Sequence, residues 1–250
     1  MKAILAAAAL TAATALPSFA FDPANMNDAE KQAFGQAVRD YLISNPEVLM
    51  EAMNEYEVKQ QAESAKNDRA LVQSFSDDIF EDGYSWVGGN PDGNITMVEF
   101  MDYKCGYCKQ VNPQVEDFLK TDANTRYIIK EFPILGPESE LAARFAIAVK
   151  QAAGDEAYKK AHDALMALRA PVNEESLKKI AGDIGVDAPD VLKRLNDDAV
   201  TEVIQKNHAL AQKMQIQGTP TFIIGGEMLR GVPQQGIAAV VETVRKSDDG

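Results

Sequence analysis

The sequence predicts an α/β domain that carries a large helical insertion and follows a small helical module. Two apolar strand candidates, 95–100 and 126–132, flank a helix candidate, so they form a βαβ unit with parallel strands. Between 137 and 214, apolar residues then recur at helical spacing almost without interruption. The chain has 250 residues, 46% of them hydrophobic, which is enough for a substantial core.

The charge balance excludes some classes of partner. Asp and Glu outnumber Lys and Arg by 38 to 25, which gives a net charge of -13. This acidity argues against nucleic acid or an anionic membrane surface as a partner. After the first twenty residues, no segment is apolar over the length needed to span a bilayer.

Residues 1–20 have the pattern of a secretory signal peptide. Lys2 supplies a positive charge, "AILAAAALTAATAL" is a short apolar run, and small residues follow Pro17. We expect cleavage after Ala20 and export to a bacterial periplasm. An uncleaved membrane anchor is the alternative, although the apolar run is short for a spanning helix.

Residues 21–57 are predicted to form a small helical module. Apolar residues recur at helical spacing over 28–43 and again after Asn45, which suits an N-cap, and Pro46, which suits the first helical position. A unit of this size buries too little apolar surface to be stable alone. It therefore needs to pack against the rest of the chain or against another copy of itself.

The next predicted segments connect the module to the catalytic domain. Residues 58–76 are polar and predict an exposed linker helix, or otherwise a surface helix of a single domain. The catalytic domain is then predicted at 77–250. It begins with a loop at 82–94, which is rich in Gly, Asn and Asp.

The catalytic domain is predicted to contain four further features after its first strand. The helix after the cysteines contains Pro113. The insertion at about 137–214 reads as four helical segments, whose boundaries are marked by Asn173, Ser176, Gly185 and Pro189. A β-hairpin with its turn at 225–226 and a final helix follow.

The chain contains two cysteines, Cys105 and Cys108, in the stretch "DYKCGYCKQ". A bond between them closes almost no loop, so a structural staple explains them poorly. Zinc sites use four ligands, and the two histidines, His162 and His208, are far from the cysteines in sequence. A two-thiolate Cu(I) site stays open because soft thiolates suit that ion.

Redox chemistry fits the position of the pair better. Cys105 lies where a strand ends and a helix begins, and the helix N-terminus stabilises a thiolate. We expect Lys104 and Lys109 to add to this effect. Cys108 lies one turn further in, so it is expected to be more buried and to have a higher pKa. Cys105 is therefore predicted to attack a disulfide and Cys108 to resolve the mixed disulfide.

Glu99 is a further catalytic candidate. It lies in the apolar strand "ITMVEF", six residues before Cys105. Burial of a carboxylate is costly, so we expect its pKa to be raised. Such an acid beneath the cysteines could carry a proton to or from Cys108. A strand-edge glutamate that faces solvent is the alternative.

These residues together resemble a known family. The strand followed by "CGYC", Pro113, the helical insertion, and Thr219-Pro220 before a hairpin resemble the thioredoxin fold. The large insertion is similar to that of the DsbA family of periplasmic thiol–disulfide oxidoreductases. The stretches "VEFMDYKCGYC", "KEFPILGPESELAA" and "GTPTFIIGG" resemble its ScsC-like branch, and "YLISNPEVLMEAM" resembles the N-terminal helical module of that branch.

The resemblance implies roles for particular residues. Cys105 and Cys108 form the redox-active pair, with no other cofactor, and Glu99 matches the buried acid of these folds. Thr219 and Pro220 form a cis-proline loop beside the cysteines, whose backbone pairs with an extended substrate. Gly106 and Tyr107 are expected to contact the substrate as well.

Two departures from the DsbA pattern bear on the direction of the reaction. Gly106-Tyr107 stands where DsbA has Pro-His, and Thr219 stands where it has valine. Both features resemble disulfide isomerases such as DsbC, which are oligomers kept reduced by a partner. We therefore expect a disulfide isomerase or reductase that acts on misfolded exported proteins, with a membrane redox partner. A homo-oligomer is expected, a trimer rather than a dimer. A monomeric dithiol oxidase and a periplasmic Cu(I)-handling protein are the alternatives.

Overall fold

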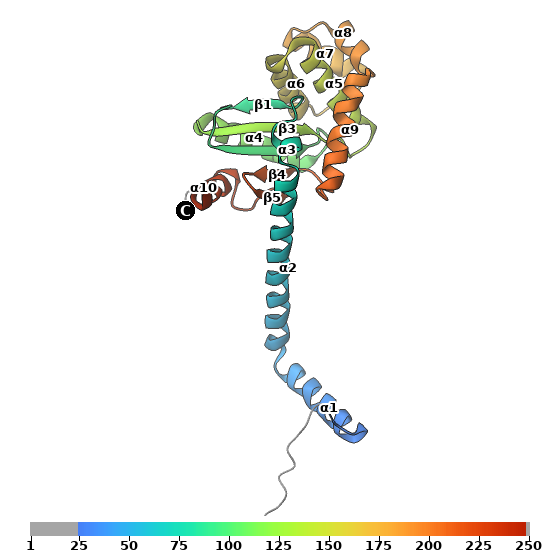
Figure 1. Ribbon diagram of the computed structural model, residues 1–250. Coiled ribbons are helices and arrows are strands. Elements are labelled where there is room, and N and C mark those ends of the chain that lie inside the picture. Colours follow the sequence, from blue (N-terminus) through green and yellow to red (C-terminus); the bar gives the residue numbers. More distant parts are fainter. Residues whose placement is uncertain (1–24, 249–250) are drawn as a thin grey trace, which may run out of the picture. The chain divides into compact units, whose positions relative to one another are not determined.

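The computed structural model describes residues 25–248 (Figure 1). The predicted signal peptide therefore lies outside the described residues. The chain divides into two units, with the boundary between Lys59 and Gln60. Among the described residues, no helix combines the length and apolar character that crossing a membrane requires.

The first unit consists of α1 (Asp28–Ser44) and the first part of α2 (Pro46–Ser74). Asn27 caps α1, since its Oδ1 accepts a hydrogen bond from the Glu30 backbone N–H at 3.0 Å. Asn45 directly precedes α2, which begins at Pro46 as expected, and its carbonyl accepts from the Val48 N–H at 3.2 Å. Its side chain donates to the carbonyl of Tyr41 at 2.8 Å, so the same residue also completes the C-terminus of α1.

The first unit buries no side chain between residues 25 and 59. The helices nevertheless carry many large apolar residues on their surface. Those that are more than a third exposed are Phe34, Val38, Tyr41, Leu42, Ile43, Leu49, Met50, Met53, Tyr56 and Val58. This unit therefore has an extensive apolar surface and no core of its own.

The second unit is built on a mixed five-stranded sheet of order β1-β3-β2-β4-β5. Strands β2 and β3 are parallel, as the βαβ pattern predicts, and all other neighbouring pairs are antiparallel. The strands are β1 (Trp86–Gly89), β2 (Ile95–Met101), β3 (Thr125–Glu131), β4 (Thr221–Ile224) and β5 (Glu227–Arg230). β1 lies in the predicted loop 82–94, where the buried Trp86 ring edge-packs on Tyr127, with centroids 6.1 Å apart.

Alternation along the two central strands separates two cores. Met97 and Met101 belong to the core that includes α4 (Gly106–Thr121) and α10 (Ile237–Asp248). Val98 and Phe100 face the opposite core, which includes Leu210 of α9 (Asp198–Lys213). Side chains at odd positions of β2, including Glu99, therefore point towards the helix that follows the cysteines.

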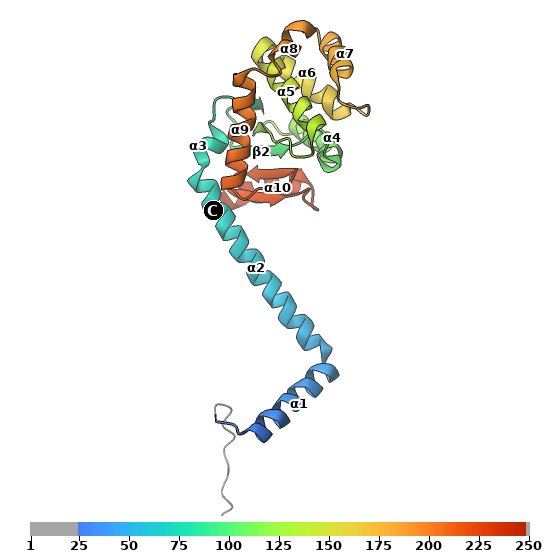
Figure 2. The same ribbon diagram turned by 90° about the vertical axis from the view of Figure 1, so that its right-hand side faces the viewer.

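The helical insertion contains five helices where four segments are expected. They are α5 (Pro137–Ala153), α6 (Asp155–Ala167), α7 (Glu174–Ile184), α8 (Ala188–Arg194) and α9 (Asp198–Lys213). The segment after Gly185 breaks at Leu195–Asp197, where the Asp197 N–H bonds back to the Arg194 carbonyl at 2.9 Å. Figure 2 shows α9 running from the insertion along the sheet.

Most residues of the expected linker helix over 58–76 are exposed, but part of its second half packs against the second unit. Asp68 and Val72 at the end of α2 are buried, and both guanidinium ends of Arg230 bind the Asp68 carboxylate. The Arg69 guanidinium also bonds Glu227 at 2.5 Å. The residues from Gln60 onwards thus belong to the second unit, and the end of α2 is tied to the β4–β5 hairpin.

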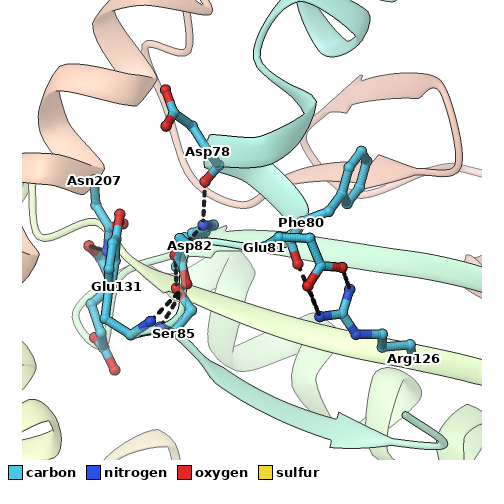
Figure 3. Close-up of polar contacts among 10 residues, drawn as sticks. Asp78, Phe80, Glu81, Asp82, Ser85, Arg126, Glu131 and Asn207 are labelled. Atoms are coloured by element: carbon cyan, nitrogen blue, oxygen red, sulfur yellow. Dashed lines mark hydrogen bonds and ion pairs between the residues drawn. The ribbon is translucent and has the colours of Figure 1, made fainter. Parts of the chain in front are cut away.

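A short helix, α3 (Ser76–Phe80), and the loop after it are fixed to β3 by charged side chains. The buried Lys130 ammonium pairs with Asp82 and donates to the Asp78 carbonyl at 2.8 Å. Figure 3 shows Arg126 further along the strand, where it donates to the Phe80 carbonyl and pairs with Glu81. Burial opposes ionisation of Asp82, but the Lys130 ammonium and the Ser85 donors outweigh it and lower its pKa.

Candidate functional site

The two cysteines lie at the start of α4, as expected. Cys105 is the N-cap residue with extended backbone, and Cys108 lies in the first turn. Both thiols are free, so the structure has the dithiol form. Cys105 is 6% exposed and Cys108 is fully buried, which confirms the predicted asymmetry in burial.

The turn before α4 is held by Asp102, a residue that the sequence reasoning missed. Its Oδ1 accepts from the Lys104 N–H at 2.7 Å, and its Oδ2 accepts from the N–H groups of Ile134 and Leu135 at 2.8 and 3.1 Å. This carboxyl group is 1% exposed. It therefore links the approach to the cysteines to the loop after β3.

The predicted proline loop faces the first cysteine. The Thr219–Pro220 bond is cis, and the Cys105 Sγ donates to the Thr219 carbonyl at 3.2 Å. Within residues 25–248, the Thr219 N–H bonds to no other backbone group. A backbone donor next to the more accessible thiol is thus available for a bound extended chain.

Glu99 lies beneath the cysteines and is 1% exposed, which excludes the solvent-facing alternative. Its Oε2 accepts a hydrogen bond from Tyr127, whereas its Oε1 has no partner among the described residues. Burial raises the pKa of Glu99 to about 7, against the opposing effect of the Tyr127 hydrogen bond. Burial, together with the Glu99 carboxylate, also raises the pKa of Cys108.

Glu131 is a second buried acid that the sequence reasoning did not find. It ends β3 and is 3% exposed, with its Oε1 accepting from Tyr103 at 2.8 Å and from Tyr158 at 2.6 Å. Burial raises its pKa to about 8, although both tyrosine hydrogen bonds act in the opposite direction. The sequence feature that could have identified it is the one that identified Glu99, a glutamate inside an apolar strand. Tyr103 connects Glu131 to the residues directly before Cys105.

The two lysines that are expected to support the Cys105 thiolate both have other partners for their ammonium groups. Lys104 pairs with Glu138 at 2.8 Å. Lys109 donates to the Leu168 carbonyl at 2.5 Å, and burial lowers its pKa. The helix N-terminus thus remains as the feature that favours a thiolate at Cys105.

The surface around the dithiol is open and partly apolar. Tyr107 is 67% exposed and Leu135 is 52% exposed, although both are large apolar residues. A Cβ added at Gly106 would meet no other atom within 4 Å. The residue pair between the cysteines is therefore accessible to a macromolecular substrate.

Another group of metal-type ligands lies away from the dithiol. Ligand atoms of Glu116, His162 and Asp163 lie within 4.8 Å of one another. The Lys159 ammonium already pairs with Glu116 at 3.0 Å and with Asp163 at 2.7 Å. Burial and this lysine lower the pKa of His162 to about 3, and its ring nitrogens contact Tyr103 and Asn112. The Lys159 ammonium therefore already balances the charge of the two carboxylates, although Glu116 Oε1 has no hydrogen-bond partner among the described residues.

Comparisons with known proteins agree with this arrangement. Residues 96–239 match the DSBA-like thioredoxin domain family. Residues 30–63 match the N-terminal domain family of the copper resistance protein ScsC.

Two solved structures each match a large part of this chain. A thioredoxin-like oxidoreductase from Silicibacter pomeroyi is 34% identical, with a TM-score of 0.63 over 70% of this chain and 98% of that chain. A linker-deletion mutant of Proteus mirabilis ScsC is 27% identical, with a TM-score of 0.64 over 90% of this chain and 98% of that chain.

Some curated relatives are much longer proteins. The Na(+)/H(+) antiporter NhaA 1 of Salinispora arenicola is 30% identical over 58% of this chain but only 22% of its own length. The chain spans between 22% and 25% of three such antiporters, so their transport function does not carry over. The family match over 96–239 includes both cysteines, Thr219 and Pro220, and the chain belongs to the DSBA-like thioredoxin domain family.

Proposed function

We propose that this protein is a thiol–disulfide interchange protein that acts on exported polypeptides. The observation that carries the proposal is the pairing of a helix-capping Cys105 with the Thr219 backbone, at 3.2 Å, next to a buried Cys108. One thiol is placed to react with a bound chain, and the other is shielded from it.

The chemistry proceeds through a mixed disulfide. The Cys105 thiolate attacks one sulfur of a substrate disulfide, and the other substrate sulfur leaves as a thiolate. In isomerisation, a second substrate thiolate attacks the mixed disulfide and releases Cys105, with no net redox change. In reduction, the Cys108 thiolate attacks Cys105 instead, so the substrate becomes a dithiol and the protein becomes the disulfide.

Glu99 acts as the proton carrier for Cys108 in this proposal. A buried thiol with a raised pKa must lose its proton before it can attack. The Glu99 carboxyl has a pKa of about 7 and an unpartnered oxygen, so it can exchange a proton near neutral pH.

We favour isomerisation or reduction over oxidation. Gly106-Tyr107 and Thr219 depart from the DsbA pattern towards that of isomerases. The apolar surface of the first unit supports a homo-oligomer, as does the match of 30–63 to the ScsC N-terminal domain family. In this scheme the protein is periplasmic after signal cleavage, and a membrane redox partner keeps the dithiol reduced.

A refolding assay on a scrambled disulfide protein tests this function. We expect the mature protein to restore native disulfides, and expect deletion of residues 21–60 to produce a monomer without that activity. The reduction potential of the Cys105–Cys108 pair distinguishes the isomerase from the alternative, a monomeric oxidase. A potential of about -270 mV excludes a strong oxidant, whereas one of about -120 mV with a monomeric native mass would overturn the isomerase assignment.

Cu(I) handling is a second candidate, supported by two free thiols one helical turn apart. One equivalent of Cu(I) should then protect Cys105 and Cys108 from alkylation. If the thiols react at the same rate with and without Cu(I), this candidate is excluded.

A further inference from the structure

Glu131, the second buried acid, lies beside the approach to the cysteines. It is the last residue of β3 and pairs in the sheet with Met101, the last residue of β2. Because these strands are parallel, both end at the same edge of the sheet, and the turn that carries Cys105 starts directly after Met101. Glu131 thus lies at the edge of the sheet from which the reactive thiol is presented.

Hydrogen bonds join Glu131 to the chain on both sides of the cysteines. The Tyr103 hydroxyl, two residues before Cys105, donates to Glu131 Oε1 at 2.8 Å. The same hydroxyl lies 3.2 Å from His162 Nδ1, and His162 Nε2 lies 3.3 Å from Asn112 Oδ1 in α4. The network therefore connects the turn before the cysteines to the helix after them, through the insertion helix α6.

The two carboxyl oxygens of Glu131 have different surroundings. Oε1 accepts from Tyr158 at 2.6 Å as well as from Tyr103, whereas Oε2 has no partner in the described part of the chain. A proton on this carboxyl therefore belongs on Oε2, since both tyrosine hydroxyls already donate to Oε1. Glu131 and Tyr158 also line a cavity of about 250 Å³, which has room for water molecules that can take up this proton.

No positive charge balances an ionised Glu131. Its neighbour in β3, Lys130, pairs with Asp82, and Lys150, which lines the same cavity, pairs with Asp155 at 2.8 Å. Within residues 25–248, no ion pair includes Glu131. A buried carboxylate without a cation is costly, so this carboxyl stays neutral beyond the ordinary range of a glutamate.

The groups that face Glu131 or its tyrosine partners come from each element packed against it. They are Glu99 of β2, Asp102 after β2, Tyr103 before α4, Tyr84 before β1, Lys150 of α5, Tyr158 and His162 of α6, and Asn207 of α9, which donates to the Glu131 carbonyl at 2.9 Å (Figure 3). Burial raises the pKa of Glu131 to about 8 against its two tyrosine hydrogen bonds, and the charge of Asp102 adds to the rise. Because the pKa of His162 is lowered to about 3 and those of Tyr103 and Tyr158 are raised far above 10, Glu131 is the member of this network that changes charge near pH 8.

We propose that Glu131 is a positioning residue for the interchange reaction: through Tyr103 it holds the turn that presents Cys105, and its ionisation destabilises the Cys105 thiolate. This inference rests on the proposed interchange function. A thiolate and an ionised carboxylate are like charges in one poorly solvated region, so each disfavours the other. Glu131 therefore keeps its proton while the pair is reduced. When the cysteines form their disulfide, the thiolate charge is lost, and Glu131 releases its proton more readily to water in the cavity.

The test measures the equilibrium constant between the Cys105–Cys108 pair and glutathione over a range of pH. Glu131→Gln keeps the shape of the neutral acid and cannot ionise. We expect this variant and the wild type to agree below about pH 7, and the wild type to be oxidised at least about threefold more readily at about pH 9. That factor corresponds to about 14 mV in the reduction potential. Titration of Glu99 is common to both proteins, so it cancels in the comparison.

Thr125→Val is the matched control, because Thr125 is a buried polar residue at the other end of β3. It should lower the stability but follow the wild-type curve at every pH. Tyr103→Phe keeps the acid but removes its hydrogen bond to the turn, so it should reduce the change that the wild type shows above about pH 8. A Glu131→Gln protein that matches the wild type at every pH, or differs from it by one constant factor, would overturn the proposal. The full wild-type change in Tyr103→Phe would overturn it as well.

A titration of Glu131 itself separates this inference from the proposed function. Carbon-13 NMR of the glutamate carboxyl groups, assigned by comparison with Glu131→Gln, gives the pKa of Glu131 in the dithiol and disulfide forms. We expect its acidity constant to be about threefold larger in the disulfide form, because the coupling is reciprocal. That result supports the inference even if the protein rearranges no scrambled substrate, an outcome that contradicts the interchange function alone. Equal pKa values in the two forms reject the coupling.

Discussion

Cys105 and Cys108 are chemically identical residues, and their surroundings give them different reactivity. Cys105 caps a helix beside the Thr219 backbone, and Cys108 is fully buried above Glu99 with a raised pKa. Substituting one thiol at a time should therefore give opposite results with a disulfide substrate.

We expect Cys108→Ser to accumulate a mixed disulfide with substrate, because the resolving thiolate is absent. Cys105→Ser should form none, because its remaining thiol is buried. Mass spectrometry of acid-quenched mixtures under non-reducing conditions measures both. A stable adduct on Cys108 in the Cys105→Ser protein would contradict the assigned order of attack.

The two buried acids make stability depend on pH. The pKa of Glu99 is raised to about 7 and that of Glu131 to about 8, so the folded protein holds protons that the unfolded chain releases near its ordinary pKa of 4.5. This stabilisation is fully present below about pH 4.5 and is lost as the pH rises through the folded pKa values. Each acid lowers the free energy of unfolding by up to about 1.4 kcal/mol per pH unit within its range.

The corresponding experiment is urea unfolding of the reduced protein at a series of pH values. The wild type should lose stability from about pH 5 to pH 8. In Glu99→Gln, the free energy of unfolding should fall less steeply with pH up to about pH 7. In Glu131→Gln, it should fall less steeply up to about pH 8. If the two variants keep the wild-type slope, these acids do not titrate as assigned.

The chemistry-bearing residues were predictable from sequence to different degrees. A glutamate in an apolar strand predicted a buried acid at Glu99, and the same pattern at Glu131 was overlooked because no motif adjoins it. Asp102 carries no sequence signal, because its importance depends on chain segments brought together by the fold. Lys104 and Lys109 show the converse, since proximity in sequence did not place their charges at the thiol.

At the scale of elements, Asp102 and Asn173 show how local hydrogen bonds differ in weight. Asn173 caps α7 in a solvent-exposed capping box, with its Oδ1 2.9 Å from the Ser176 N–H. Asp102 is buried and satisfies three backbone N–H groups in two segments. Loss of an exposed cap therefore lowers the free energy of unfolding less than leaving several buried N–H groups without a hydrogen-bond partner.

We therefore expect Asn173→Ala to lower the free energy of unfolding by about 1 kcal/mol without changing thiol–disulfide exchange. Asp102→Ala should lower it by about 3–5 kcal/mol and slow the reaction of Cys105, since the turn before α4 loses its support. Denaturant unfolding and the rate with glutathione disulfide measure the two effects. Equal destabilisation by both substitutions would contradict the role of Asp102.

The missed and split elements have physical causes. β1 has two glycines among its four residues, and it is a strand because β3 pairs with it and Trp86 packs in the core. The break between α8 and α9 falls in a sequence with continuous helical spacing. Strong local patterns, such as the Asn173 cap and the hairpin turn, were predictable, whereas elements made by tertiary pairing were not.

At the scale of the whole molecule, the two units differ in how far they bury their apolar side chains. The second unit buries two extensive cores, while residues 25–59 bury no side chain. Along α2, Leu49 and Met53 are 55% and 51% exposed and lie one helical turn apart, whereas Glu51 and Glu55 occupy another face. Such an apolar face is stabilised when another copy of the chain covers it, because burying each such side chain contributes about 1.5–3 kcal/mol.

We expect the double variant Leu49→Glu, Met53→Glu to be monomeric in light scattering at concentrations where the wild type is an oligomer. Reversing the charge on the other face with Glu51→Lys, Glu55→Lys is the control and should leave the native mass unchanged. The monomeric variant should still reduce glutathione disulfide, because the dithiol lies in the second unit, but should lose activity on a scrambled protein. A wild-type protein that is monomeric at every concentration would contradict the role of this apolar face, and full isomerase activity in a monomer would separate oligomerisation from catalysis.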